Sequence, residues 1–350
     1  MSSATTNTGD GRPLVALAMG DPAGISPELV ARLIGSPAVA GAARLVVIGD
    51  RRVLEGGARV AGVALDIETV EIGAIGPAER PVLVDLGNLD PAAVAIGEAT
   101  PAGGRFAVET FTCALRLAEA GAVAAVCYAP FNKKAMRFAH AGYDDESRFI
   151  SDLLRPAGRI REFNVLETVW NARVTSHIPL RDVAANLSEE AILAEIAQTV
   201  DCLRRAGVAA PRLLVAGLNP HAGDGGSFGT EEIDIIGPAV KRAVAEGFDV
   251  SGPHPADTVF LAALKGGHHA VVTMYHDQGQ IAMKLMGFER GVTLLGGLPF
   301  PVCTPAHGTA YDIAGKGLAD SRAGEAAILL AARLAAAPAA ALPPDAGHPG

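Results

Sequence analysis

Residues 13–30 read PLVALAMGDPAGISPELV, a short apolar run followed directly by the start of a helix. The run at 13–20 carries no charge, which is typical of a strand covered on both faces. Ser26 and Pro27 then resemble a helix start, with the serine predicted as the N-cap and the proline at the first helical position. A buried strand followed by a helix predicts an α/β unit built on a parallel sheet.

The same alternation continues along the chain. Ser188 and Thr230, each followed by two glutamates, predict further helix starts, and Gly207 and Gly247 predict helix ends. Strands are expected at 13–20, 44–50, 81–87, 122–129, 163–169, 212–218, 270–276 and 291–297. We therefore expect an α/β fold with a largely parallel sheet in each of two domains.

Composition narrows the class of protein. The chain has 350 residues, of which 49% are hydrophobic and 19% charged, so it can form a large core. Its net charge of -9, with both signs interspersed, argues against a nucleic-acid partner. No apolar run reaches the roughly 18–20 residues of a membrane span, and four scattered cysteines are typical of a reducing cytoplasm. The ends, 1–11 and 339–350, are predicted to be disordered tails.

Two familiar nucleotide motifs, G-x-G-x-x-G and the P-loop, do not occur in the sequence. One hydrolase motif matches literally, because Gly225 to Gly229 fits G-x-S-x-G around Ser227. A nucleophile elbow joins a strand directly to a helix, whereas Ser227 follows the predicted strand end at Leu218 by nine residues. A serine hydrolase using Ser227 is therefore kept only as a remote alternative.

Three histidines follow predicted strands or extended segments: His177 in VTSHIPL, His221 in LNPHAGDGG and His276 in TMYHDQG. Ligands of α/β sheets bind at the carboxyl ends of the strands. Three imidazoles brought together there could hold one divalent metal ion and leave positions open for substrate. From spacing alone, however, a lone histidine is more often an ordinary surface or hydrogen-bonded residue than a metal ligand.

The stretch HGTAYDIAGKGLAD, residues 307–320, has polar and glycine residues that could bind adenosine. The carboxylate of Asp312 could accept a hydrogen bond from a ribose 2′-hydroxyl and repel a 2′-phosphate, which favours NAD over NADP. The alternative is a loop followed by a helix cap.

Several motifs together resemble the 4-hydroxythreonine-4-phosphate dehydrogenase family: MGDPAGISPELV, SHIPL, LNPHAGDGGSFGTEEID, YHDQGQIAMKLMGFERGV and HGTAYDIAGKG. The last also resembles the adenosine loop of isopropylmalate and isocitrate dehydrogenases. The resemblance implies two α/β domains with a cleft between them, in a homodimer. We assign residues 12–130 and 295–338 to an NAD-binding domain, and residues 131–294 to a metal, substrate and dimerisation domain.

The resemblance also implies a reaction, in which a β-hydroxy acid is oxidised by NAD and then loses CO₂ with the help of a divalent metal. Imidazole ligands suit Zn²⁺, Co²⁺ or Ni²⁺ better than Mg²⁺, although Mg²⁺ stays open. The residues that match the family's motifs are His177, His221 and His276 for the metal, His307, Gly308, Ala310 and Asp312 for the cofactor, and Asp257, Asp277 and Lys284 for catalysis. The alternative for Asp257 and Asp277 is that they orient the histidines.

The sequence departs from the family at its phosphate site. Where the family has a His-Thr pair this chain has Glu146 and Ser147, and Thr293 and Val302 replace an asparagine and an arginine. Lys284 persists, and Arg148 could contact a carboxylate. We therefore expect Glu146, Ser147, Arg148, Lys284 and Thr293 to bind substrate. The alternative substrate is a non-phosphorylated hydroxy acid or a cis-dihydrodiol carboxylate of the terephthalate dihydrodiol type.

Overall fold

The computed structural model describes residues 11–76, 79–156 and 158–337, and the chain divides into two compact units. Unit 1 comprises the described residues up to Ile160 together with residues 292–337, and unit 2 comprises Arg161–Gly291. The α/β architecture predicted from the sequence is confirmed in both. The predicted disordered tails lie outside the described residues, except for Gly11.

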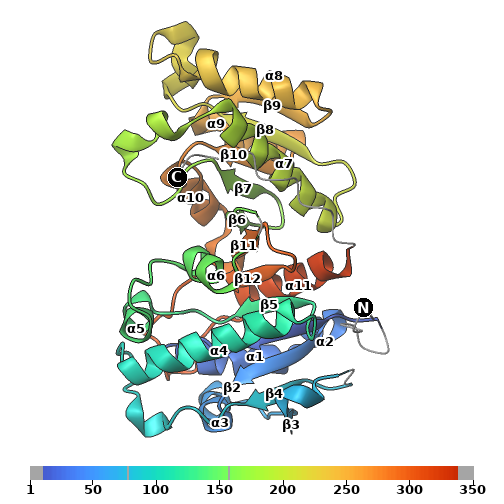
Figure 1. Ribbon diagram of the computed structural model, residues 1–350, viewed down its shortest axis with the longest axis vertical. Helices are drawn as coiled ribbons and strands as arrows, with labels where there is room; N and C mark the ends of the chain where they lie inside the picture. The colour runs from blue at the N-terminus through green and yellow to red at the C-terminus, as the bar shows by residue number, and fades with distance from the viewer. Residues whose placement is uncertain (1–10, 77–78, 157, 338–350) are drawn as a thin grey trace. The chain divides into compact units, whose positions relative to one another are not determined.

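Unit 1 is a doubly wound α/β unit with strand order β3-β4-β2-β1-β5-β12-β11 (Figure 1). All neighbouring strands in it are parallel except β11 and β12, which pair antiparallel. Its strands are β1 (Leu14–Ala18), β2 (Arg44–Gly49), β3 (Glu68–Val70), β4 (Val82–Asp85), β5 (Ala125–Tyr128), β11 (Val292–Gly296) and β12 (Val302–Pro305). Its helices are α1 (Ser26–Ile34), α2 (Pro37–Ala42), α3 (Arg51–Ala61), α4 (Pro101–Glu119), α5 (Lys133–Ala139), α6 (Glu146–Leu154) and α11 (Arg322–Ala336).

The core of unit 1 follows from the alternation of side chains along its strands. Leu14, Ala16 and Ala18 of β1 pack in one cluster with apolar residues of α4, such as Phe111. Alternate β1 residues such as Val15 point to the opposite face and are equally buried. This explains why the strand has an unbroken apolar sequence.

Unit 2 is a smaller sheet with strand order β6-β7-β10-β8-β9. β6 and β7 pair antiparallel, and the other neighbours are parallel. Its strands are β6 (Arg161–Val165), β7 (Trp170–Arg173), β8 (Arg212–Ala216), β9 (Asp249–His254) and β10 (Ala270–Thr273). Its helices are α7 (Glu189–Arg205), α8 (Gly237–Ala245), α9 (Ala256–Gly266) and α10 (His276–Gly287).

All eight expected strands are present, although several of their ends are shifted, the C-terminal end of β6 the most. Four strands were missed: β3, β7, β9 and β12. β3 and β12 are only three and four residues long, and the polar sequences of β7 and β9 carry no clear hydrophobic pattern.

The start of α1 differs from the expectation. Ser26 is the first helical residue and Ile25 occupies the N-cap position without a side-chain cap. The Ser26 hydroxyl instead donates a hydrogen bond to the backbone oxygen of Pro130, 3.0 Å away, so it links β1's loop to the end of β5. Ser188 does cap α7, because its hydroxyl accepts a bond from the amide of Ala191.

The unit boundary also differs from the one we expected. Residues 131–160 were assigned to the second domain, but they belong to unit 1. The reason is packing: Met136 of α5 and Phe149 of α6 share the core cluster of Phe111, and the rings of Phe111 and Phe149 stack with centroids 5.7 Å apart.

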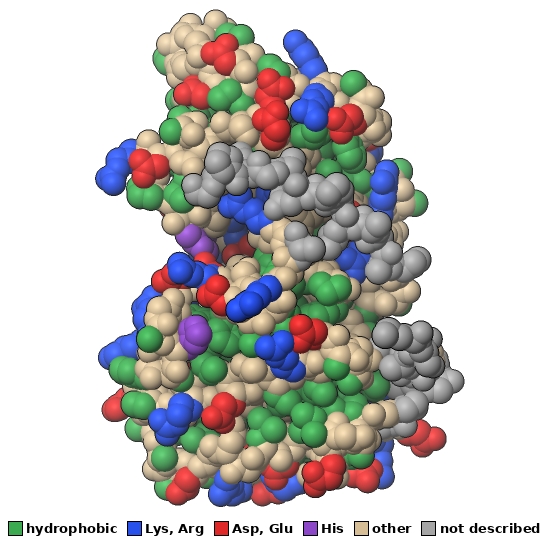
Figure 2. Space-filling model, in the orientation of Figure 1, with side chains coloured by type: hydrophobic (Ala, Val, Ile, Leu, Met, Phe, Trp, Pro, Cys, Tyr) green, Lys and Arg blue, Asp and Glu red, His purple; other side chains and the backbone are tan. Residues whose placement is uncertain are grey.

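On the face drawn in Figure 2, acidic and basic side chains are interspersed.

Within the described part of the chain, no helix combines the length and apolar character needed to cross a bilayer.

Candidate functional site

A pocket of about 450 Å³ lies in unit 2 beside two of the predicted metal ligands. His177 and His276 both line it, and their ring centroids are 5.7 Å apart. A zinc-bound imidazole places its centroid about 3 Å from the metal, so two imidazoles on one ion have centroids about 5–6 Å apart. The spacing of this pair therefore fits two ligands of one divalent ion. The other lining residues are Thr175, Ser176, Ile178, Leu180, Val183, Tyr275 and Asp277.

Asp277 determines which nitrogen of His276 faces outward. The Nδ1 of His276 is 2.7 Å from Oδ1 of Asp277, so Nδ1–H donates to the carboxylate. The Nε2 atom then keeps its lone pair and can act as a metal ligand. A carboxylate that holds the far nitrogen of a metal-binding histidine also raises its basicity.

The segment that carries His276 is anchored by a residue to which the sequence assigned no role. The amide of Met274 donates to Oε1 of Gln278 over 2.7 Å, and Nε2 of Gln278 donates to the backbone oxygen of Gly217 over 2.7 Å. Gln278 thus ties the end of β10 to the end of β8. Its place in the YHDQG motif was the available signal.

His221 lies on a separate loop of unit 2 with an uncommon backbone. Residues 221–225 all have positive φ, including His221 at 55°, Ala222 at 53° and Asp224 at 43°. A left-handed conformation costs a non-glycine residue roughly 1–2 kcal/mol, and such strain concentrates at functional sites. His177 shares this feature, with φ of 53°. The two predicted ligands that follow strands β7 and β8 are therefore both held in strained backbone.

The His221 loop is held in place by a buried carboxylate. Glu232 is 5% exposed, and its Oε1 accepts hydrogen bonds from the amides of Leu218 and Asn219, each 2.7 Å long. Glu232 was expected to sit near a helix start as a dipole partner, but its side chain supports this loop instead.

His221 does not join the other two histidines within this chain. Its ring lies beside Phe228, with centroids 6.2 Å apart. Among the described residues, no three His, Cys, Asp or Glu side chains group closely enough to hold one metal ion. The metal prediction thus fits His177 and His276, and the structure does not bring His221 to them.

The remaining catalytic candidates of unit 2 are exposed. Asp257 lies in the first turn of α9 and Lys284 in the last turn of α10, and neither lines the pocket of His177 and His276. Ser227 follows a loop of left-handed residues rather than a strand, and its hydroxyl makes no hydrogen bond to a histidine in the described part of the chain. The geometry of a hydrolase nucleophile is therefore not present at Ser227.

Unit 1 contains the loop expected to bind NAD. Gly308 and Asp312 are exposed, and Ala310 has a left-handed φ of 43°. The Nδ1–H of His307 donates to the backbone oxygen of its neighbour Gly308 over 3.1 Å, whereas its Nε2 is buried without a partner among the described residues. A buried ring nitrogen without a partner is a position where a ligand group fits.

The NAD loop is fastened to the loop after β1. Glu28 is 2% exposed and accepts hydrogen bonds from the amides of Gly317 at 3.0 Å and Ala319 at 2.7 Å. The hydroxyl of Tyr311 donates to Oδ2 of Asp21 over 2.5 Å. These contacts join the motifs MGDPAGISPELV and HGTAYDIAGKG into one structure at the carboxyl end of β1.

Asp21 and Tyr311 both have perturbed acidities. Burial raises the pKa of Asp21, against the opposing effect of the hydrogen bonds from Tyr311 and the Ala23 amide. Burial also raises the pKa of Tyr311, and the Asp21 carboxylate raises it further. The sequence reasoning did not single out either residue.

Two of the expected substrate residues of unit 1, Glu146 and Arg148, already have partners in the chain. Oε1 of Glu146 accepts a hydrogen bond from the Tyr143 hydroxyl over 2.8 Å, and Arg148 pairs with Asp144 over 2.8 Å. Ser147 lies beside them on α6, Thr293 lies in β11 opposite Thr304, and Val302 is fully buried in β12. Lys284 belongs to unit 2.

The fold and these loops define a two-unit α/β protein with polar side chains concentrated where strands end. Residues 41–331 match the family model described as "Pyridoxal phosphate biosynthetic protein PdxA". The chain is 65% identical over 337 residues to the "Putative 4-hydroxythreonine-4-phosphate dehydrogenase 2" of Rhizobium meliloti, covering 95% of this chain and 97% of the relative.

Two solved structures agree. The 4-hydroxythreonine-4-phosphate dehydrogenase of Klebsiella pneumoniae has a TM-score of 0.80 and 36% identity, covering 95% of this chain and 99% of that one. The terephthalate 1,2-cis-dihydrodiol dehydrogenase of Burkholderia xenovorans has a TM-score of 0.62 and 31% identity, covering 88% and 94%. The chain therefore belongs to the PdxA family of 4-hydroxythreonine-4-phosphate dehydrogenases, which confirms the resemblance seen in its motifs.

Proposed function

We propose that this protein is an NAD-dependent and divalent-metal-dependent dehydrogenase that oxidises a β-hydroxy acid and releases CO₂. The observation that carries the proposal is the His177–His276 pair, with centroids 5.7 Å apart at a pocket, in a chain of this family. Relatives are named as dehydrogenases, which supports an oxidoreductase.

The residues of unit 2 would act as ligands and as proton carriers. His177 and His276 would hold the ion, with His221 as the third predicted ligand, and a bound metal would stabilise negative charge on the substrate oxygen. Asp277 would orient the ring of His276 and, through the 2.7 Å bond to Nδ1, hold the neutral imidazole in the tautomer that leaves Nε2 as the ligand atom. Asp277 lines the pocket and is therefore better placed for proton transfer there than Asp257 or Lys284.

The NAD assignment is supported by unit 1. The 307–317 loop is tied to the carboxyl end of β1 by Glu28 and Asp21, which is where nucleotides bind in doubly wound sheets. The Nε2 of His307, buried without a partner among the described residues, would bind the cofactor, and the exposed carboxylate of Asp312 would accept from a ribose hydroxyl and disfavour NADP.

A second candidate concerns the substrate. The stretch 144–148 carries three carboxylates and only one guanidinium, which is paired with Asp144. One like-charge contact at about 4 Å and an effective dielectric near 20 costs roughly 4 kcal/mol, so a phosphate dianion near Glu146 would be disfavoured. This supports a non-phosphorylated hydroxy acid or a cis-dihydrodiol carboxylate as substrate, in keeping with the similarity to the terephthalate dihydrodiol enzyme.

The proposed homodimer is supported by exposed apolar residues on unit 2. Ile281 and Leu285 lie one turn apart on α10 and are 62% and 84% exposed. Such an uncovered apolar stripe is typical of a protein interface. Light scattering on the purified protein tests the dimer, and a monomer at micromolar concentration would contradict it.

The activity is tested by following NADH formation and CO₂ release with 4-hydroxythreonine 4-phosphate, its non-phosphorylated analogue and a cis-dihydrodiol carboxylate. We expect chelation to abolish the reaction and a divalent ion to restore it. His177→Ala and His276→Ala should lose bound metal by elemental analysis, whereas His140→Gln, outside the pocket, should retain it. Full activity after complete metal removal would overturn the metal proposal, and high efficiency on the phosphate ester would overturn the second candidate.

A further inference from the structure

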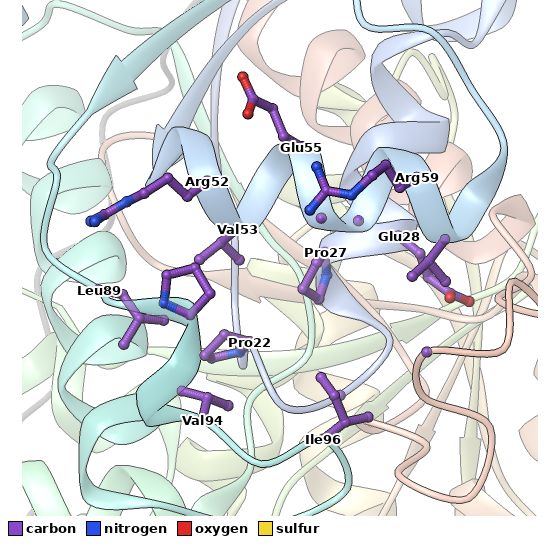
Figure 3. Close-up of a pocket in the computed structure, with 16 residues that line it drawn as sticks. Pro22, Pro27, Glu28, Arg52, Val53, Glu55, Arg59, Leu89, Val94 and Ile96 are labelled. Atoms are coloured by element: carbon purple, nitrogen blue, oxygen red, sulfur yellow. The ribbon is translucent and has the colours of Figure 1, made fainter.

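A second pocket, of about 510 Å³, lies within unit 1 and contains none of the residues assigned to cofactor, metal or substrate. Its volume is within the about 300–1,000 Å³ that small-molecule sites usually have. It opens beside the residues that follow β1, β2 and β4, so it lies at the carboxyl edge of a mostly parallel sheet. The structure shows it between α3, the start of α1 and the segment 89–96 (Figure 3).

The walls of this pocket are mainly apolar. Two of its side chains are large hydrophobic groups left open to solvent, Val60 at 38% and Ile96 at 58% exposure. The other apolar lining residues are Pro22, Pro27, Val53, Leu89, Pro91 and Val94, several of which gather on one side of the pocket in Figure 3. An apolar wall of this kind selects a ligand with an apolar or aromatic body.

Gly56 of α3 lines the pocket and has no side chain to fill it. A Cβ built on Gly56 would meet only Nη2 of Arg59, at 3.7 Å. The neighbouring Gly57 is different, because its Cβ would lie 2.2 Å from the backbone of Pro27 and so is required for the packing of α1 on α3. Gly56 therefore has no packing role on this face, and its missing side chain keeps the pocket open.

Among the described residues, the charges at the pocket leave one cation without a partner. Arg52 is bound by Asp50 through two hydrogen bonds of 3.0 and 2.7 Å, and Glu55 pairs with Arg51 at 3.6 Å. The Glu28 carboxylate is held by two backbone amides. Arg59 makes no hydrogen bond or ion pair to the described part of the chain, and its guanidinium lies over α3 in Figure 3.

We propose that this pocket is a second binding site, which takes a small aromatic or apolar molecule with a single anionic group. The apolar wall would bind the body of the ligand. Arg59 would donate to the anion, in a charge-assisted contact that also permits stacking of the planar guanidinium on a ring. The pocket contains none of the predicted cofactor positions His307, Gly308, Ala310 and Asp312, but Gly315 of the same loop borders it, so competition with NAD tests whether the two sites are separate.

The probe for this site is anilinonaphthalene sulfonate, an aromatic monoanion whose fluorescence rises on binding to an apolar surface. Titration of the full-length protein should show one saturable site, and the uncharged analogue without the sulfonate should bind at least about tenfold more weakly. Arg59→Gln should weaken binding of the sulfonate by about tenfold or more, whereas the matched variant Arg52→Gln, whose arginine is already paired, should change it less than about twofold.

A cavity-filling pair isolates the site from other apolar surfaces. Gly56→Phe should abolish the saturable signal, and Gly41→Phe, a helical glycine on α2 whose Cβ would meet nothing within 4 Å, should leave it unchanged. Circular dichroism verifies that each variant is folded, and the Arg59 variant provides the test without adding bulk. Equal binding to Gly56→Phe and wild type would overturn the proposal.

Competition with NAD separates this proposal from the proposed function. We expect NAD to leave binding of the probe unchanged within about twofold. Displacement of the probe by NAD at a single stoichiometric site would show that the pocket belongs to the cofactor site, and would overturn a separate site while supporting the NAD assignment. Loss of dehydrogenase activity in all assays would contradict the proposed function without affecting this test.

Discussion

Replacing Tyr311 by phenylalanine should destabilise the protein more at high pH than at low pH. The change removes one hydroxyl that donates to the buried carboxylate of Asp21 over 2.5 Å. Asp21 is 1% exposed, and among the described residues its only other side-chain hydrogen bond comes from the Ala23 amide, 2.8 Å away. The variant therefore leaves a buried negative charge with one donor instead of two.

The expected magnitude follows from the ionisation of Asp21. A hydrogen bond to a charged group contributes about 1.5–3 kcal/mol, and one between neutral groups about 0.5–1.5 kcal/mol. Because the Tyr311 ring is only partly buried, we expect values at the low end of these ranges. Tyr311→Phe should lower the free energy of unfolding by about 1.5–2 kcal/mol when Asp21 is ionised and by about 0.5–1 kcal/mol when Asp21 is protonated.

The sign of the pH dependence follows from the direction of the shift. Burial raises the pKa of Asp21 in the folded state above its value in the unfolded chain. A carboxyl group whose pKa is higher in the folded state than in the unfolded state stabilises the fold at pH values below its unfolded-state pKa. This contribution is lost as the pH rises through its folded-state pKa. The Tyr311 bond opposes the raised pKa, so its removal raises the pKa of Asp21 further and enlarges the loss at higher pH.

The assay is urea unfolding at about pH 5 and about pH 8, followed by circular dichroism. The single tryptophan, Trp170, lies in β7 and reports unit 2 separately by fluorescence. The control is the same substitution in an Asp21→Asn background, where the pH dependence of the Tyr311→Phe effect should disappear. An equal loss of unfolding free energy at both pH values, or a pH dependence that persists in the Asp21→Asn background, would refute the reasoning.

Three further predictions test the packing and the buried charges. Gly57→Ala should destabilise unit 1 by about 1–3 kcal/mol in urea unfolding, because its Cβ would lie 2.2 Å from the Pro27 carbonyl; near-wild-type stability would contradict this close contact of α1 and α3. Glu195→Ala should lower the free energy of unfolding by about 3–5 kcal/mol, because it leaves Arg161, which is 13% exposed, without the carboxylate that pairs with it. In urea unfolding, the double variant Arg161→Met with Glu195→Leu should recover most of this loss, and no recovery would contradict this account. Thiol titration of the native protein should modify Cys113 first, since burial raises the pKa of Cys202 to about 12 and raises that of Cys127 further; rapid reaction of all four thiols before unfolding would disagree. The buried thiols are Cys127, Cys202 and Cys303.

The sequence alone determined the α/β class, because strands covered on both faces need unbroken apolar runs such as LVALA of β1. It also determined the family, because the motifs at residues 219–226 and 275–279 combine glycines and polar groups in an order that ordinary packing does not require. The polar strands β7 and β9 escaped it, since their pairing depends on neighbours distant in sequence and not on a local pattern.

Only the tertiary structure decided how these motifs are supported. Gln278 joins β10 to β8, Glu232 holds the left-handed loop of His221, and Tyr311 is bound to Asp21 across 290 residues of sequence. It likewise placed His276 beside His177 and, among the described residues, kept His221 apart from them within one chain. A sequence lists donors and acceptors in order along the chain, but the energy of a buried carboxylate depends on which of them the fold brings within about 3 Å of it.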